Sequence, residues 1–197
     1  MAEDDPHGAF VLGVDLDGVV ADFTAGFRPI VAEELGVEAA SLGDARSWEL
    51  SEWGIADKER LDELFRAAVV DHRLFRKLAP IPGAAEVLQG LSQDGVHIRI
   101  VTHRIVLSGA HAITVHDTVE WLDEYGIPYW DLCFLGRKSD LALDLLIDDA
   151  PHNVESLRAA GREILVMDQP YNRHVGGPRA MDWHDVDAYV RARMASG

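Results

Sequence analysis

The sequence predicts an α/β protein with a doubly wound parallel β-sheet, a Rossmann-like fold, and two features of the chain lead to this prediction. Short apolar runs typical of strands buried on both faces of a sheet occur at residues 10–14, 96–102, 132–135, 143–147 and 163–167. Segments with helical periodicity lie between them, at residues 83–93, 110–125 and 153–160. Strands that alternate with helices are typical of this fold, in which ligands bind beyond the carboxyl ends of the strands.

The segment after the first strand breaks this alternation, because it holds two helical patterns and no strand pattern. One apolar face consists of Phe23, Phe27, Ile30, Val31 and Leu35, and the other of Leu61, Leu64, Phe65 and Ala68. Asp57 is suited to cap the second helix, and Pro80 and Pro82 mark the return to the sheet. We therefore predict a small helical cap at residues 21–78, inserted into an α/β core formed by residues 1–20 and 79–197.

Composition limits the partners of the chain. Its 197 residues suffice for one compact core with a small appended unit. With 34 acidic and 18 basic residues, the formal net charge is -16, which disfavours nucleic-acid polymers and anionic membranes. A small anionic substrate needs a local cation to offset this field. The acidic N-terminus resembles no signal segment, so we expect a cytoplasmic protein, for which a homodimer is compatible with the sequence.

The strongest motif is the sequence from Asp15 to Gly18 at the end of the first predicted strand. Asp15 and Asp17 are two positions apart, so in an extended strand their carboxylates point the same way. Gly18 allows the backbone to turn sharply after them. A calcium loop is the alternative, but an apolar run follows where further oxygen ligands would be needed. The motif therefore indicates two carboxylates that face one substrate.

A second acidic pair, Asp148 and Asp149, follows the apolar run 143–147. Carboxylates about 4 Å apart repel by about 4 kcal/mol at an effective dielectric constant of 20, and a divalent cation relieves this repulsion. Oxygen ligands together with a phosphate favour Mg²⁺. The alternative for Asp149 is an N-cap of the helix that begins near Pro151.

Two further residues complete the candidate site. Thr102 ends the strand 96–102, where its hydroxyl group and the following backbone N–H groups can hold a phosphoryl oxygen. Lys138, ten residues before Asp148, can balance the charge of Asp15 and of the phosphate.

In this order and spacing, the motifs that contain Asp15, Thr102, Lys138 and Asp148 resemble the four motifs of the haloacid dehalogenase-like superfamily, over about residues 10–174. Within the superfamily, the chain is most similar to the cytosolic and mitochondrial 5'(3')-deoxyribonucleotidase family. The shared details are Ala21-Asp22-Phe23, the short gap between Lys138 and Asp148, Asn172-Arg173-His174, and Trp183. The chain departs from the eukaryotic members at His103-Arg104, where they tend to have Ser-Pro.

The resemblance implies a phosphoric monoester hydrolase, similar to 5'-nucleotidases. Asp15 would be the nucleophile, and Asp17 would act first as acid and then as base. Mg²⁺ would be held by Asp15, by the backbone carbonyl of Asp17, and by Asp148 or Asp149. The expected substrate is a small phosphorylated metabolite, a deoxynucleoside monophosphate in particular. The residues expected to bind it are Gly18, Phe23, His103 and Arg104.

Three alternatives remain at the level of sequence. A phosphatase for another small metabolite or a sugar phosphate would use the same catalytic residues. A signalling receiver domain also combines acids, a Thr and a Lys on a doubly wound sheet, but it lacks the helical insertion and has its acid pair after the first strand. A non-catalytic phosphate-binding module would not require the complete set of acids.

Overall fold

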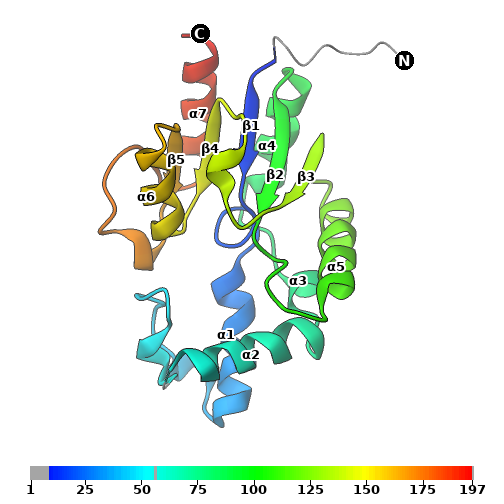
Figure 1. Ribbon diagram of the computed structural model, residues 1–197, viewed down its shortest axis with the longest axis vertical. Helices are drawn as coiled ribbons and strands as arrows, with labels where there is room; N and C mark the ends of the chain where they lie inside the picture. Colours follow the sequence, from blue (N-terminus) through cyan, green and yellow to red (C-terminus); the bar gives the residue numbers. More distant parts are fainter. Residues whose placement is uncertain (1–8, 56, 197) are drawn as a thin grey trace.

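The computed structural model describes residues 9–55 and 57–196, and its centre is a parallel β-sheet (Figure 1). The six strands have the order β3-β2-β1-β4-β5-β6, and every neighbouring pair is parallel. They are β1 (Val11–Val14), β2 (His97–Thr102), β3 (Asp131–Phe134), β4 (Leu145–Asp148), β5 (Ile164–Met167) and β6 (Arg179–Ala180). The predicted fold class is therefore confirmed.

Helices cover both faces of the sheet. They are α4 (Ala84–Gln93), α5 (His111–Glu124), α6 (Pro151–Ala159) and α7 (Trp183–Met194). Successive residues of β4 lie on opposite faces of the sheet. Leu145 belongs to a buried cluster with residues of α4 and α7, whereas Leu146 belongs to a cluster with Val154 and Leu157 of α6. This alternation is why the strands read as continuous apolar runs.

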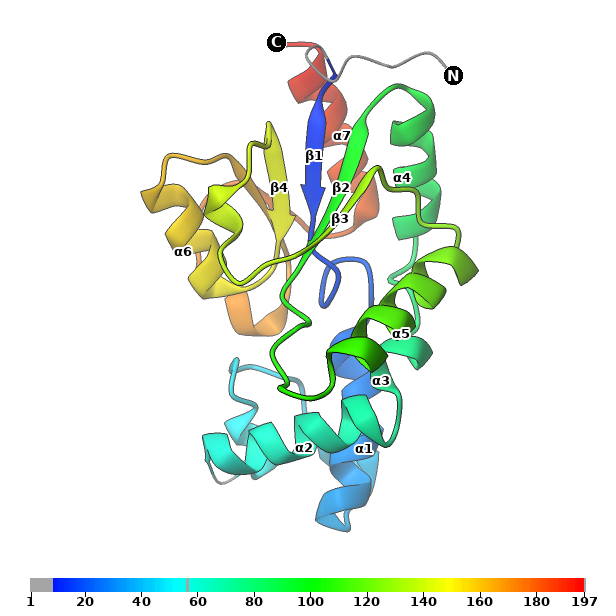
Figure 2. The same cartoon turned by 45° about the vertical axis from the view of Figure 1, so that its right-hand side comes forward.

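The helical insertion lies beyond the carboxyl ends of the strands, as Figures 1 and 2 show from two sides. It contains α1 (Phe23–Leu35), α2 (Lys58–Val70), the short α3 (Leu74–Lys77) and two 3-10 turns, η2 (Ala39–Ser41) and η3 (Ser51–Trp53). The Asp57 side chain caps α2, as predicted, by accepting a hydrogen bond from the Arg60 amide. The division into a cap at 21–78 and a core at 1–20 and 79–197 stays a prediction.

The two chain segments that join the insertion to the sheet run side by side. The Asp22 amide donates to the Ala79 carbonyl at 2.9 Å, and the Ile81 amide donates to the Val20 carbonyl at 2.7 Å. A second attachment joins the end of the insertion to α5, where the Trp121 indole N–H donates to the Leu78 carbonyl at 2.8 Å. These hydrogen bonds therefore fix both the base of the insertion and its last residue to the core.

Helix α6 begins at Pro151, where the sequence predicts the start of a helix, because proline suits the first turn of a helix, in which its missing N–H costs nothing. Two elements of the fold differ from the sequence prediction. Strand β6 and helix α7 were not predicted, although Asp182 caps α7 by accepting a hydrogen bond from the Asp185 amide.

Across residues 9–55 and 57–196, no helix combines the length and apolar character needed to cross a membrane.

Candidate active site

The central strands bring the predicted acidic residues to one edge of the sheet. Val14 of β1 pairs with Ile100 of β2 and with Ile147 of β4, so the chain segments that follow these positions lie together. Asp15 follows β1, Thr102 ends β2 and Asp148 ends β4. Asp15, Thr102 and Asp148 are all buried.

Lys138 joins two of these acids. It lies in a 3-10 turn, η4 (Lys138–Asp140), and is only 4% exposed. Its ammonium nitrogen lies 2.9 Å from Asp15 Oδ1 and 2.7 Å from Asp148 Oδ2. Burial lowers the pKa of Lys138, but the carboxylates of Asp15 and Asp148 outweigh burial and raise it overall. Lys138 therefore stays charged in the site.

The two acids after β4 have different surroundings. Asp148 Oδ1 accepts a hydrogen bond from the Ala150 amide at 2.9 Å, and the Asn153 amide group lies 3.1 Å from both Asp148 oxygens. Asp149 accepts a short hydrogen bond from the Tyr171 hydroxyl through Oδ2, while its Oδ1 is buried without a hydrogen-bond partner. The N-cap of α6 is Ala150, so the alternative reading of Asp149 as an N-cap is wrong.

The carboxylates form a cluster with an excess of negative charge. Ligand oxygens of Asp15, Asp148 and Asp149 lie within 4.8 Å of one another. Burial raises the pKa of Asp15 to about 7; Lys138 opposes this shift, and the Asp148 and Asp17 carboxylates add to it. Burial also raises the pKa of Asp149 well above its usual range, with further contributions from Asp148 and Asp15. Three acids face one ammonium group, so the cluster and the unpartnered oxygen of Asp149 fit a cation.

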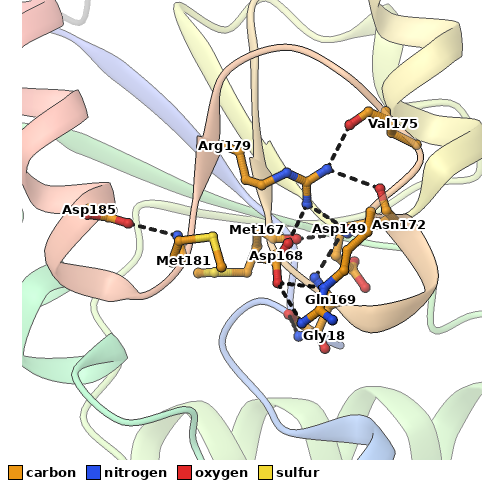
Figure 3. Close-up of polar contacts among 11 residues, drawn as sticks. Gly18, Asp149, Met167, Asp168, Gln169, Asn172, Val175, Arg179, Met181 and Asp185 are labelled. Atoms are coloured by element: carbon orange, nitrogen blue, oxygen red, sulfur yellow. Dashed lines mark hydrogen bonds and ion pairs between the residues drawn. The ribbon is translucent and has the colours of Figure 1, made fainter. Parts of the chain in front are cut away.

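Gly18 is required at its position in the turn after Asp17. Its φ of 81° lies in the left-handed region, and a Cβ atom there would collide with the Asp149 carboxylate and the Tyr171 hydroxyl. The Gly18 carbonyl accepts a hydrogen bond from the Gln169 side chain at 2.7 Å (Figure 3). This turn therefore lies directly against the acid cluster.

The loop between β5 and β6 supports the cluster from the other side and was not predicted as part of the site. Figure 3 shows its polar contacts. The buried Asn172 side chain donates to the backbone carbonyls of Asp149 and Met167, both at 2.8 Å, and accepts from Arg179 at 2.7 Å. These bonds fix the loop that places Tyr171 against Asp149. In the sequence, only Asn172-Arg173-His174 indicates a role for this loop, as a detail shared with the nucleotidase family that the chain resembles.

Arg104 and Asp17 form an ion pair. The Arg104 guanidinium donates to Asp17 Oδ2 at 3.0 Å and to Oδ1 at 2.7 Å. Arg104 is only 2% exposed, so it is a buried partner of Asp17 and not a solvated surface arginine.

Two other residues predicted to bind substrate, Phe23 and His103, differ in their surroundings. Phe23, half-buried at the start of α1, packs against Phe27 and Phe65 with ring centroids 5.3 Å and 6.1 Å away. His103 is exposed overall, but the partial burial of its ring, together with the charges of Lys138 and His152, lowers its pKa.

A cavity of about 450 Å³ lies between the insertion and the core. Its lining residues are Arg46, Ser47, Trp48, Glu49, Pro151, His152, Glu155, Tyr171 and His174. Trp48 of the insertion meets His152 and Tyr171 edge-on, with ring centroids 5.2 Å and 5.5 Å away. Because Tyr171 also contacts Asp149, the cavity adjoins the acid cluster.

The fold and the ordered acids define a haloacid dehalogenase-like protein, and comparison with solved structures agrees. A hydrolase of the haloacid dehalogenase-like family from Streptococcus pneumoniae superposes with a TM-score of 0.63 at 16% identity, covering 92% of this chain and 98% of that one. A predicted phosphatase from Clostridium acetobutylicum gives a TM-score of 0.62 at 14% identity, covering 93% and 99%. At these identities the likeness concerns the fold alone.

Sequence comparison defines the family. The family model described as 5' nucleotidase, deoxy (pyrimidine), cytosolic type C protein matches residues 9–195. An inferred 5'(3')-deoxyribonucleotidase of Chlorobaculum tepidum is 44% identical over 184 residues, which cover 93% of this chain and 91% of the relative. A 5'(3')-deoxyribonucleotidase of Bacillus subtilis is 27% identical over 188 residues, which cover 90% and 96%. The chain belongs to this nucleotidase family, which confirms the resemblance and the prediction of a phosphoric monoester hydrolase.

Proposed function

We propose that the protein is a magnesium-dependent 5'(3')-deoxyribonucleotidase that hydrolyses deoxynucleoside monophosphates through a phospho-aspartate at Asp15. The observation that carries this proposal is the buried cluster in which Lys138 bridges Asp15 and Asp148 beside the unpartnered oxygen of Asp149. The names of the relatives support the substrate class.

Mg²⁺ would be held by Asp15, by the backbone carbonyl of Asp17 and by Asp149. Between the two acids after β4, the hydrogen bonds favour Asp149 as the direct ligand. Both Asp148 oxygens already accept from Lys138, Ala150 or Asn153, whereas Asp149 Oδ1 has no donor. When bound, the metal would supply positive charge for the approaching phosphate dianion and for the nucleophile.

In the first half-reaction, Asp15 attacks phosphorus. A bond forms between an Asp15 carboxylate oxygen and phosphorus while the ester bond breaks. The leaving ester oxygen takes a proton from Asp17, so an alcohol departs rather than an alkoxide. The exposed fraction of the Asp17 side chain, 26%, supports this role, because substrate can reach it.

In the second half-reaction, water attacks the phosphorus of the phospho-aspartate. Asp17, now a carboxylate, accepts the proton from this water, the acyl phosphate bond breaks, and Asp15 returns as a carboxylate with release of inorganic phosphate. Lys138 and Thr102 would hold the phosphoryl oxygens, and the turn at Gly18 would leave room for the phosphate. Lys138 is already positioned for this task by its contact with Asp15.

Phe23, His103 and the cavity beside Trp48 are candidates for holding the nucleoside. An aromatic ring that stacks on a base contributes about 1 to 3 kcal/mol. Phe23 is packed against two other rings, whereas Trp48, which lines the cavity, is 48% exposed. Arg104 is buried and paired, so its contribution to substrate binding would pass through Asp17.

We further propose that the enzyme acts in the cytoplasm on small metabolites and not on nucleic-acid polymers. The formal charge of -16 supports this, since it opposes binding to polyanions. A homodimeric state stays a prediction.

The test is a turnover screen with and without Mg²⁺ on deoxynucleoside monophosphates, ribonucleoside monophosphates and sugar phosphates. The proposal expects metal-dependent phosphate release with the highest kcat/KM on deoxynucleotides. A preference for sugar phosphates would contradict the substrate class and favour the metabolite-phosphatase alternative.

Two substitutions locate the nucleoside. Phe23→Ala and Trp48→Ala are each compared on deoxyuridine monophosphate and on 4-nitrophenyl phosphate. The residue that contacts the base should show a loss of kcat/KM on the nucleotide only. Equal losses on both substrates would assign that residue to packing.

A further inference from the structure

Arg104 lies two residues after Thr102 and reaches from the end of β2 to the turn after β1. Its Nε and one terminal nitrogen donate to the two Asp17 oxygens at 3.0 Å and 2.7 Å. Such a two-bond contact fixes the plane of a carboxylate as well as its position. The two residues are 87 positions apart in the sequence, so only the folded chain brings them together.

The guanidinium is itself held on its other sides. Its remaining terminal nitrogen lies 3.2 Å from the Thr118 hydroxyl, which in turn donates to the Thr114 carbonyl at 2.7 Å. Its central carbon lies 4.3 Å from the centroid of the Phe75 ring and 6.0 Å from that of Trp121. A guanidinium flanked in this way has little freedom to turn.

The pair is asymmetric in its access to solvent. The Arg104 side chain is fully buried, whereas the Asp17 side chain keeps an exposed fraction of 26%. A carboxylate has about four lone-pair positions, so the two bonds to Arg104 leave positions free on each oxygen. The fixed partner therefore lies behind Asp17, and the open side of Asp17 remains for substrate.

A buried ion pair is weak support for stability, because removing two charges from water offsets most of their attraction. We propose that Arg104 is a positioning residue, which holds the Asp17 carboxylate in the orientation needed for proton transfer to the leaving group and acts on the rate only through Asp17. The proposal rests on the proposed function, in which Asp17 is the acid and base.

A double-mutant cycle tests this route. The wild type, Arg104→Met, Asp17→Asn and the double variant are compared on deoxyuridine monophosphate and on 4-nitrophenyl phosphate, with Mg²⁺. The parameter is kcat/KM, which covers the steps through departure of the leaving group. A misplacement of about 1 Å in a reacting group can cost about 100-fold, so we expect a loss of this order on the nucleotide for Arg104→Met.

The two substrates and the double variant separate positioning from general damage. The nitrophenolate leaves without a proton, so Arg104→Met should change kcat/KM on the aryl phosphate by less than about 3-fold. In the Asp17→Asn background, Arg104→Met should add less than about 2-fold on the nucleotide, because both substitutions remove the same interaction. Losses that multiply in the double variant, or that are equal on both substrates, would overturn the proposal.

Two further variants control for misfolding. Arg104→Lys keeps the charge but not the two-bond contact, so it should retain the wild-type unfolding temperature more closely and still lose activity selectively on the nucleotide. Arg76→Met removes an arginine that joins α3 to Glu120 and Glu124 of α5 without touching Asp17, and it should leave kcat/KM unchanged on both substrates. If the wild type hydrolyses neither substrate, the proposed function fails and this proposal with it. If the wild type is active but the losses in kcat/KM from Arg104→Met and Asp17→Asn multiply in the double variant, only the role of Arg104 is overturned.

Discussion

The substitution Asp149→Asn should stabilise the metal-free protein and abolish its response to magnesium. Asp149 is buried, its Oδ1 has no hydrogen-bond partner, and its pKa is raised well above the usual range by burial and by the neighbouring carboxylates. The amide side chain keeps an acceptor for the Tyr171 hydroxyl but carries no charge. The substitution therefore removes repulsion that only a cation relieves in the wild type.

The size of the effect follows from the spacing of the acids. Two ionised carboxylates 4.8 Å apart, the upper limit in the cluster, repel by about 3.5 kcal/mol at an effective dielectric constant of 20. Asp149 faces two such carboxylates, Asp15 and Asp148, and Lys138 offsets one of them, so the net repulsion that the substitution removes is about 3.5 kcal/mol. A gain of about 3.5 kcal/mol in the free energy of unfolding raises the unfolding temperature of a chain of this length by about 7 to 14 °C.

The gain in stability from Asp149→Asn should increase as the pH rises. A raised pKa in the folded state means that the folded protein holds a proton that the unfolded chain releases. The metal-free wild type should therefore be most stable below the pKa that these acids have in the unfolded chain. Its stability should fall as the pH rises through the pKa in the folded state, which is about 7 for Asp15. The advantage of Asp149→Asn should be small at pH 5 and large at pH 8.

The assay is thermal unfolding at pH 5 and pH 8, in chelator and in Mg²⁺. Magnesium at about 100 times its dissociation constant adds about 2.7 kcal/mol to the wild type and nothing to a variant that does not bind it. Asp140→Asn is the matched control, because Asp140 is exposed in the same turn as Lys138 and should respond like the wild type. A magnesium-dependent rise retained by Asp149→Asn, or no gain in chelator at pH 8, would refute the reasoning.

Three further substitutions test the rest of the cluster. Asp15→Asn should abolish turnover while the circular dichroism spectrum stays that of the folded wild type, and a variant with wild-type turnover would exclude Asp15 as nucleophile. Lys138→Ala leaves two buried carboxylates without their cation, so it should cost about 3 to 5 kcal/mol in denaturant unfolding and weaken binding of beryllium fluoride. Unchanged affinity for beryllium fluoride would place Lys138 outside the phosphate site. Gly18→Ala forces a Cβ into the Asp149 carboxylate at a left-handed φ, so calorimetry should show lower stability and a weaker response to magnesium, and an unchanged response would contradict the packing of this turn.

The sequence could predict the sheet and most of the acid cluster because both depend on local patterns. A buried parallel strand reads as an apolar run, and the residue after it falls at the carboxyl edge, which placed Asp15, Thr102 and Asp148 correctly relative to one another. Helix α7 was missed although Trp183, Val186 and Val190 follow helical spacing after the Asp182 cap.

Other features of the site have no local signal. Arg104 and Asp17 are paired across 87 residues, and Tyr171 reaches Asp149 across 22 residues through the loop that Asn172 fixes. Such contacts depend on the tertiary fold, so the sequence could name Arg104 as a candidate but not predict that it is buried. The different hydrogen bonding of Asp148 and Asp149 likewise became visible only in the folded chain.

The central claim is that phosphate passes through Asp15, and one measurement tests it directly. The wild-type enzyme is quenched in acid during turnover of deoxyuridine monophosphate with Mg²⁺, and its peptides are analysed by mass spectrometry. The account predicts the added mass of one phosphoryl group on Asp15, present only with substrate and metal. A phosphoryl group found on another residue during turnover would contradict it. Release of inorganic phosphate in a single turnover with no phosphopeptide at any time point would also contradict it, because water would then attack the substrate directly.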